Sequence, residues 1–280
     1  MHFLMMLIGL GLAWGVRSFA TAATGNLTKR WQQTLGLFLF SPLLLLMTAL
    51  AILCMGPSGQ MLGHWEGWLG YDLAFWFLAW AIASGIKLAW EGHQTVQRLR
   101  QNPVIEINGN VAYLLDTSEL YSAQVGFWQP ELVVSQGLLT TLDDEHLEAV
   151  LVHEQAHAHY HDTFWFFWLG WLRRLTCWLP HTEALWQDLL MLRELRADQR
   201  AVSQVDPLVL AESLLMVVSA PLMQPEVCAT FSWTVSRDRL TERIDSLLAD
   251  SAPAMPTNLW SMSWLLLVLL PLMTIPLHVG

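Results

Sequence analysis

The chain has 280 residues, of which 54% are hydrophobic and 14% are charged, and its formal net charge is −10. Soluble domains contain about 25% charged residues, so much of this chain is not expected to face water. The negative charge argues against nucleic-acid binding, because contacts with phosphates require an excess of basic side chains. The sixteen tryptophans favour a membrane–water interface, where indole rings are enriched.

Four apolar stretches predict transmembrane helices, because about 20 apolar residues cross the hydrocarbon core of a bilayer. They are residues 2–16, Leu35–Met55, Tyr71–Trp90 and Leu259–Leu277. A cleaved signal peptide is an alternative for the first stretch, since Ala20-Thr21-Ala22 resembles a cleavage site. A signal peptide carries positive charge before its apolar core, and none precedes this one. We therefore expect a retained first span.

These spans divide the chain into three expected regions. They are an N-terminal membrane region of three helices at 1–92, a cytoplasmic domain at 93–257 and a C-terminal transmembrane helix at 258–280. Lys29 and Arg30 join the first two spans, whereas residues 56–66, between the second and third, contain no lysine or arginine. The positive-inside rule then places the N-terminus outside and the central domain in the cytoplasm.

The central domain begins with strand signals. Pro103–Ile107 and Val111–Leu115 flank Asn108-Gly109, a pair that favours a type I′ hairpin turn. Another short strand is predicted at Leu132, Val133, Val134 and Ser135.

The run Leu147–Tyr160 predicts a helix that contains His153-Glu154-Gln155-Ala156-His157. Residues four apart lie one turn apart on a helix, so both imidazoles can bind one Zn²⁺. Glu154 points from the same side without being a ligand and can take a proton from a water at the metal. A solvated helix with scattered histidines is the alternative. The apolar residues Val150 to Val152 indicate instead that the helix is at least half buried.

The third ligand is predicted in Arg193-Glu194-Leu195-Arg196-Ala197-Asp198. Glu194 and Asp198 share a helix face, so we expect Glu194 to bind the metal and Asp198 to accept the second N–H of a ligating histidine. An ordinary charged helix face is the alternative, and the upstream histidines favour the site, with one Zn²⁺ per chain. His161 would extend the series to three histidines, but a straight helix would be strained in bringing all three to one ion.

The stretch 163–179 is almost wholly apolar apart from Arg173-Arg174, and it is short for a span. We expect a helix that lies in or dips into the membrane surface, with a buried core helix as the alternative. Further helices are predicted at 182–203, 208–220 and 237–248.

These motifs, together with His161-Asp162 and Pro180-His181, resemble the BlaR/MecR-type membrane zinc metallopeptidases, and more distantly HtpX and the prenyl-protein (CAAX) peptidases. The resemblance covers about Val111 to Leu248. It implies a gluzincin fold, in which His153, His157 and Glu194 bind the metal, Glu154 is the general base and Asp198 supports a ligand. BlaR/MecR receptors carry an extracellular sensor domain after their last span. This chain stops at Gly280, so sensing of β-lactams by the same chain is not expected.

Two roles stay open at this point. The HtpX and prenyl-protein group often has a His-Pro pair before its late arginine motif, and this chain has none there. Candidate transition-state stabilisers are Tyr160, His181, Arg239 and Arg243, of which Arg243 is equally a candidate for a structural ion pair. In zinc peptidases with this motif, a strand beside the active-site helix often pairs with the substrate backbone. Leu132, Val133, Val134 and Ser135 are candidates for that strand, or for an ordinary sheet strand.

The expected fold is a mostly α membrane protein with about four transmembrane helices and an α+β gluzincin metallopeptidase domain with a small β-sheet. The expected function is that of an integral-membrane zinc endopeptidase that cleaves membrane or membrane-proximal proteins. Its expected partners are that substrate and the lipid bilayer, without nucleic acid, and its oligomeric state is not indicated. One alternative is a non-catalytic zinc-binding scaffold or assembly subunit, and another is a histidine-based haem or metal-handling membrane protein, which requires axial histidines within the spans.

Overall fold

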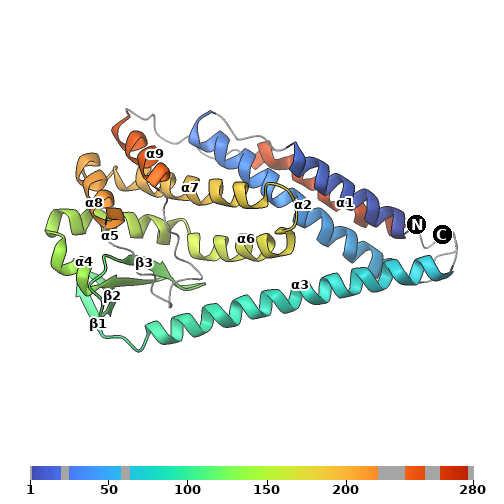
Figure 1. The fold of residues 1–280 in the computed structure, drawn as a ribbon, viewed down its shortest axis with the longest axis horizontal. Coiled ribbons are helices and arrows are strands. Elements are labelled where there is room, and N and C mark those ends of the chain that lie inside the picture. Colours follow the sequence, from blue (N-terminus) through green and yellow to red (C-terminus); the bar gives the residue numbers. More distant parts are fainter. Residues whose placement is uncertain (1, 20–24, 58–63, 220–236, 250–258, 277–280) are drawn as a thin grey trace. The chain divides into compact units, whose positions relative to one another are not determined.

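The computed structural model describes residues 2–19, 25–57, 64–219, 237–249 and 259–276 (Figure 1). The chain divides into two compact units. The first unit contains residues 1–87, 169–190 and 255–280, and the second contains residues 88–168 and 191–254. The fold is mostly helical with one small mixed sheet, as predicted.

The first unit is built from apolar helices. They are α1 (His2–Ser18), α2 (Leu27–Met55), most of α3 (His64–Leu99) and the 3₁₀ helix η2 (Leu259–Thr274). Asn26 caps the start of α2, where its side chain accepts a 2.9 Å hydrogen bond from the backbone N–H of Lys29. Phe40 and Leu44 of α2 pack against Val268 of η2, so that the two elements share a small apolar core.

Two of the helices in the described residues are long and apolar enough to cross a membrane, where the sequence predicted four spans. They are α2 and the Trp68–Leu99 part of α3. Helix α1 has 17 residues and, at 1.5 Å per residue, extends about 26 Å, less than the hydrocarbon thickness of about 30 Å. Within the last predicted span, Met262–Thr274 is likewise an apolar helix of fewer than 18 residues. The prediction was therefore too generous for the first and last spans.

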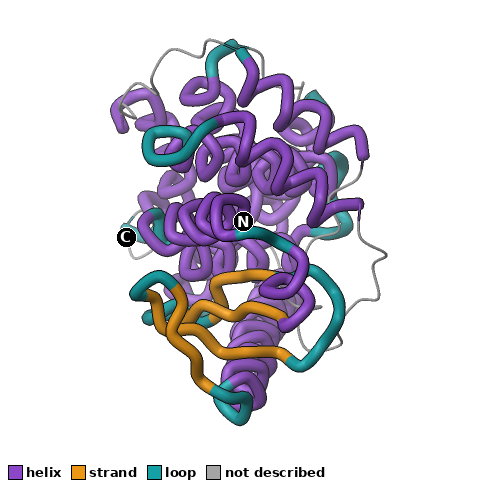
Figure 2. The backbone as a smooth tube through the Cα atoms, turned by 90° about the vertical axis from the view of Figure 1, so that its left-hand side faces the viewer, coloured by secondary structure: helices purple, strands orange, loops and turns teal. Residues whose placement is uncertain are grey.

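The second unit contains a sheet of four strands, drawn in orange in Figure 2. They are β1 (Val104–Ile107), β2 (Asn110–Leu115), β3 (Ser122–Val125) and β4 (Glu131–Ser135), in the spatial order β1-β2-β4-β3. The predicted hairpin is confirmed as β1 and β2. Its turn residues Asn108 and Gly109 have φ values of 48° and 76°, as a type I′ turn requires. Strand β4 runs parallel to β2 and antiparallel to β3, so β1 and β3 are the edges of this sheet.

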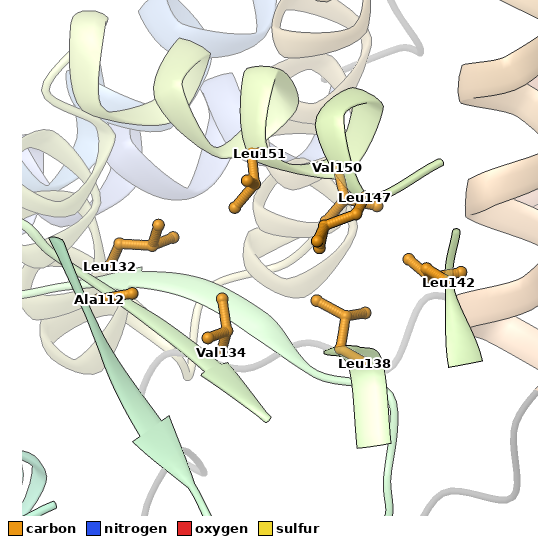
Figure 3. Close-up of a cluster of buried hydrophobic side chains, with 8 residues drawn as sticks. All are labelled: Ala112, Leu132, Val134, Leu138, Leu142, Leu147, Val150 and Leu151. Atoms are coloured by element: carbon orange, nitrogen blue, oxygen red, sulfur yellow. The ribbon is translucent and has the colours of Figure 1, made fainter. Parts of the chain in front are cut away.

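Helix α5 (Asp144–His159) lies against this sheet through an apolar face (Figure 3). Leu147, Val150 and Leu151 point toward Leu132 and Val134 of β4, and α4 (Gln136–Thr141) closes one end of the cluster. Asp143 caps α5 by accepting a 3.0 Å hydrogen bond from the backbone N–H of His146. This packing fixes α5 against the sheet, and on another side of the helix Ala149 and Val152 pack with Leu210 and Leu214 in a second apolar cluster.

The remaining helices are α6 (Asp162–Thr176), α7 (Thr182–Ala201), α8 (Pro207–Ser219) and α9 (Arg237–Leu248). Within the second unit, Leu210 and Leu214 of α8 pack with Leu240 and Leu247 of α9. Helices α6 and α7 each belong partly to both units, dividing after Trp168 and after Leu190. The part of α7 that contains Glu194 and Asp198 belongs to the second unit, together with α5.

Candidate metal centre

His153 and His157 lie on α5 outside the apolar cluster that packs on the sheet, and both side chains are buried. Their four-residue spacing places the two rings one turn apart, with ring centroids 4.8 Å apart. The two Nε2 atoms are separated by 3.2 Å. Both imidazoles therefore present the same nitrogen to one point.

Glu194 brings a carboxylate from α7 to that point. Its Oε2 lies 3.4 Å from Nε2 of His153, and its Oε1 lies 3.6 Å from Nε2 of His157. Donor atoms of these three residues all lie within 4.8 Å of one another, so the group could bind a metal ion. The geometric expectation from the sequence, that Glu194 lies near both histidines, is met.

The outer nitrogens of the two histidines each face a carboxylate. Nδ1 of His153 lies 2.9 Å from Oδ1 of Asp198, also as expected, and Nδ1 of His157 lies 2.8 Å from Oδ2 of Asp162. A carboxylate at Nδ1 favours the tautomer with its proton on that nitrogen, which leaves the Nε2 lone pair free for a metal. The residues present therefore fit a metal ion in donor type, in orientation and in tautomer.

Arg243 of α9 is buried against the acidic side of this centre. Its guanidinium donates through Nε and NH2 to the two carboxylate oxygens of Asp198, both at 2.7 Å, and its NH1 lies 3.4 Å from Oε2 of Glu194. Of the two roles that the sequence left open for Arg243, this geometry favours the structural ion pair, because a guanidinium held by two carboxylates is not free to meet a substrate.

Glu154, the candidate general base, is buried beside the histidines on α5. The hydroxyl of Ser122 donates a 3.0 Å hydrogen bond to its Oε1. Ser122 is the first residue of the edge strand β3, so the sheet orients this carboxylate directly.

Charges at the centre are strongly coupled. Burial opposes the charged form of His157, but the carboxylates of Glu194 and Asp162 outweigh it and raise its pKa to about 9. Burial likewise opposes ionisation of Glu194, but Arg193 and His157 hold its pKa well below the usual range. The pKa of Asp198 is also lowered, because Arg243 outweighs the effect of burial. The carboxylates are therefore ionised at neutral pH, and a cation that binds both imidazoles must displace protons.

The other candidates from the sequence have these contacts and positions in the chain. The ring of Tyr160, at the end of α5, is covered by the guanidinium of Arg196 at 4.1 Å. His181 belongs to the first unit, where its Nδ1 lies 2.8 Å from the carbonyl oxygen of Arg17. Arg239 lies on α9 one turn before Arg243, and its role as a stabiliser stays a prediction. His161 lies beyond the end of α5 and is exposed, so a series of three histidines on one helix does not form.

The prediction that Leu132, Val133, Val134 and Ser135 form the substrate strand has to be corrected. These residues lie in β4, which is paired with β2 on one side and β3 on the other. An interior strand has no unpaired backbone groups to offer to a peptide. The edge strand next to α5 is β3, which the sequence analysis missed.

The sequence did not predict the roles of three residues at this centre: Ser122, Asp162 and Arg193. Ser122 lies in a short strand without an apolar alternation, so no pattern marked it. Asp162 follows His157 by five residues, and residues five apart do not lie on the same face of a helix. It reaches His157 because His161 reverses the chain with a φ of 53°. Arg193 donates to Oε1 of Glu194 at 2.9 and 2.7 Å, and was read only as part of a charged run.

No curated protein matches the chain. Residues 91–219, which include α5 and the Glu194 segment of α7, match the model of peptidase family M48. That part of the chain is therefore similar to the domains of peptidase family M48, and the match supports a gluzincin-type metallopeptidase.

Proposed function

We propose that this protein is an integral-membrane zinc-dependent endopeptidase that cleaves membrane or membrane-proximal proteins. The observation that carries the proposal is the convergence of His153, His157 and Glu194 within 4.8 Å, inside the segment that matches peptidase family M48. A closer likeness to the BlaR/MecR-type, HtpX or prenyl-protein peptidases stays a prediction.

The donor set favours zinc. Two imidazole nitrogens and one carboxylate oxygen form the ligand set of many catalytic zinc sites, which keep a further position for water. When bound, Zn²⁺ supplies Lewis-acid polarisation of a scissile carbonyl and lowers the pKa of a water far below its ordinary value, to about 7. Asp198 and Asp162 hold the outer histidine nitrogens, so the inner ones are oriented before the ion arrives.

Glu154 has the position of a general base. It follows His153 directly, so its carboxylate starts on the same side of α5 as the histidines, and Ser122 fixes one of its oxygens. We expect Glu154 to accept the proton of the attacking water and to deliver it to the leaving amine. Exchanging the carboxylate for an amide removes this basicity while it preserves the shape of the side chain.

Strand β3 is the best candidate for the substrate strand. It is an edge of the sheet, and its residue Ser122 contacts the candidate base Glu154. An extended peptide added to this edge would pair its backbone with β3 and pass beside Glu154. Main-chain pairing of this kind would accept many sequences, as a protease with several protein substrates requires.

The membrane assignment is supported by α3. Only 17% of its most apolar window is buried, whereas the core helix of a soluble protein would be mostly buried. Its exposed apolar side chains include Trp76, Ile82, Ile86 and Trp90. With α2 and α3 as the spans, the basic residues of the connecting segments still favour a cytoplasmic side for residues from 91 onward. The N-terminus is outside if α1 crosses as well.

The test compares wild type with Glu154→Gln in the full chain. We expect the variant to retain one bound Zn²⁺ per chain, measured by elemental analysis of the purified protein, and to lose cleavage. Substrates should then accumulate in the membrane proteome of cells that express the variant. The matched control is Glu148→Gln, an exposed glutamate on the same helix, which should leave both zinc and cleavage unchanged.

Two results would contradict the proposal. Cleavage by Glu154→Gln at the wild-type rate would remove Glu154 from its role. Bound zinc in the wild-type protein, together with no accumulation of substrates in cells that express Glu154→Gln, would favour the alternative, a zinc-binding scaffold or assembly subunit.

A further inference from the structure

We propose that Asp162 and Arg196 form a positioning pair that fixes the imidazole of His157 for metal binding. The inference rests on the proposed function, because it concerns the same centre. It assigns a role to two residues that touch neither the substrate nor the reacting atoms, and it explains why the turn after α5 has an unusual backbone.

Asp162 is placed by that turn. Helix α5 ends at His159, and His161 then adopts a left-handed conformation with a φ of 53°. The reversal makes Asp162 the first residue of α6 and brings its carboxylate back under His157, with Oδ2 at 2.8 Å from Nδ1. Asp162 is almost fully buried, and the first turn of a helix favours a negative charge.

Arg196 holds the other oxygen of the same carboxylate. Its NH2 group pairs with Oδ1 of Asp162. Its guanidinium also lies over the ring of Tyr160, 4.1 Å from the ring centroid. The carboxylate of Asp162 is thus held at both oxygens, by a histidine on one side and an arginine on the other. A carboxylate held in this way cannot rotate away from the imidazole without breaking an ion pair.

Both positioning contacts originate from α7. Asp198 of α7 meets the outer nitrogen of His153 directly, and Arg196 of α7 acts on His157 through Asp162. Glu194 lies two residues before Arg196, and residues two apart project from different sides of a helix. One helix therefore supplies the third metal-binding candidate and, from another side, the support for the second histidine. Correct placement of α7 would orient all three donors together.

The test measures metal binding by the full-length protein in detergent, with Zn²⁺ and Co²⁺ as the probes. We expect Asp162→Asn to weaken zinc binding by about tenfold to a hundredfold, because partners of ligating histidines have effects of that size when changed. Arg196→Gln should weaken it by about tenfold, and Arg196→Lys should recover part of that loss. The visible absorption of bound Co²⁺, which reports ligand geometry, should change in Asp162→Asn and Arg196→Gln.

The matched control is Arg200→Gln. Arg200 lies one turn further along α7, 5.8 Å from the same Tyr160 ring, so its loss should leave zinc affinity and the Co²⁺ spectrum unchanged. Circular dichroism of the metal-free proteins checks that each variant is folded. If Asp162→Asn does not fold, the comparison of Arg196→Gln with wild type tests the proposal by itself.

The outcomes separate the two proposals. A wild-type chain that binds neither ion overturns the proposed function and this role with it. A wild-type chain that binds zinc, with Arg196→Gln showing the same affinity and the same Co²⁺ spectrum, overturns the positioning pair alone.

Discussion

Each of the two compact units contains a buried arginine, and the two are held in opposite ways. In the second unit, Arg243 is enclosed by the carboxylates of Asp198 and Glu194. In the first unit, Arg17 is fully buried, but its partners in the described residues are neutral. It donates to the carbonyl oxygen of Phe38 at 2.9 Å and to the hydroxyl of Thr182 at 3.3 Å, and it lies over the Phe38 ring.

The difference shows what each arginine is for. Arg243 balances the carboxylates of the candidate metal centre, so its charge is part of the electrostatics of the site. Arg17 links the end of α1 to α2 and to the start of α7 by donating hydrogen bonds to groups that carry no charge. The first unit therefore uses the arginine as a multiple donor, and the second uses it as a counter-ion.

The largest expected effect is that of Arg243→Met. The substitution leaves Asp198 buried without its counter-ion, and breaking a buried pair in this way costs about 3–5 kcal/mol. Hydrogen exchange of the α5 and α9 amides should report this loss locally, without assuming that the whole chain unfolds as one unit. Equal protection in variant and wild type would show that water or a rearranged side chain compensates for the lost partner of Asp198.

Arg17→Met is the matched variant in the other unit. No buried carboxylate is left behind in the described residues, so removal of the charge offsets the lost hydrogen bonds, and we expect a change within about 1 kcal/mol. The readout is hydrogen exchange of the α1 and α2 amides. A loss as large as that for Arg243→Met would mean that the contrast between the two arginines is wrong.

An intermediate effect is expected from pH on the metal-free protein. His157 has a pKa of about 9 in the folded chain, above the ordinary histidine value of 6.5. The stability that it contributes is therefore complete below about pH 6.5 and is lost as the pH rises through about 9. Glu194 and Asp198 have lowered pKa values, so their contribution is present above about pH 4.5 and falls in acid.

The contribution of these groups to stability is therefore greatest between about pH 4.5 and 6.5, and the thermal unfolding temperature of the metal-free chain should be highest in that range. Zinc changes the pattern, because it requires neutral imidazoles, and its affinity should rise with pH up to about 9. A metal-free stability that rises steadily from pH 6.5 to 9 would contradict the coupling between His157 and its two carboxylates.

The sequence alone located the centre because its parts have local signatures. The spacing of His153 and His157 and that of Glu194 and Asp198 both follow from the period of a helix, and that period can be read from the chain. The hairpin around Asn108-Gly109 was predictable for the same reason, since its turn chemistry is local. In each case a short-range rule determines where the side chains point.

What the sequence did not show depends on contacts between distant segments. The order β1-β2-β4-β3 places β4 inside the sheet, and no local pattern distinguishes an interior strand from an edge. The pairing of Ser122 with Glu154 and that of Arg243 with Asp198 join residues 32 and 45 positions apart. The number of spans was wrong for another reason: the first apolar stretch, residues 2–16, is already shorter than the about 20 residues that cross a bilayer, and α1 extends it only to Ser18.

The smallest expected effect on stability comes from two histidines with a left-handed backbone, one in each unit. His161 and His181 both have a φ of 53°. Such a conformation costs a non-glycine residue about 1–2 kcal/mol, while glycine adds an entropic cost of about 0.5–1 kcal/mol. His161 is exposed, so His161→Gly should stabilise the second unit by about 0.5 kcal/mol.

His181→Gly also loses the contact of its Nδ1 with the carbonyl of Arg17, worth about 1 kcal/mol, and should be neutral or slightly destabilising. Hydrogen exchange of the amides that begin α6 and α7 would detect both changes. Stabilisation of both variants to the same extent would show that the imidazole of His181 does not help to hold Arg17.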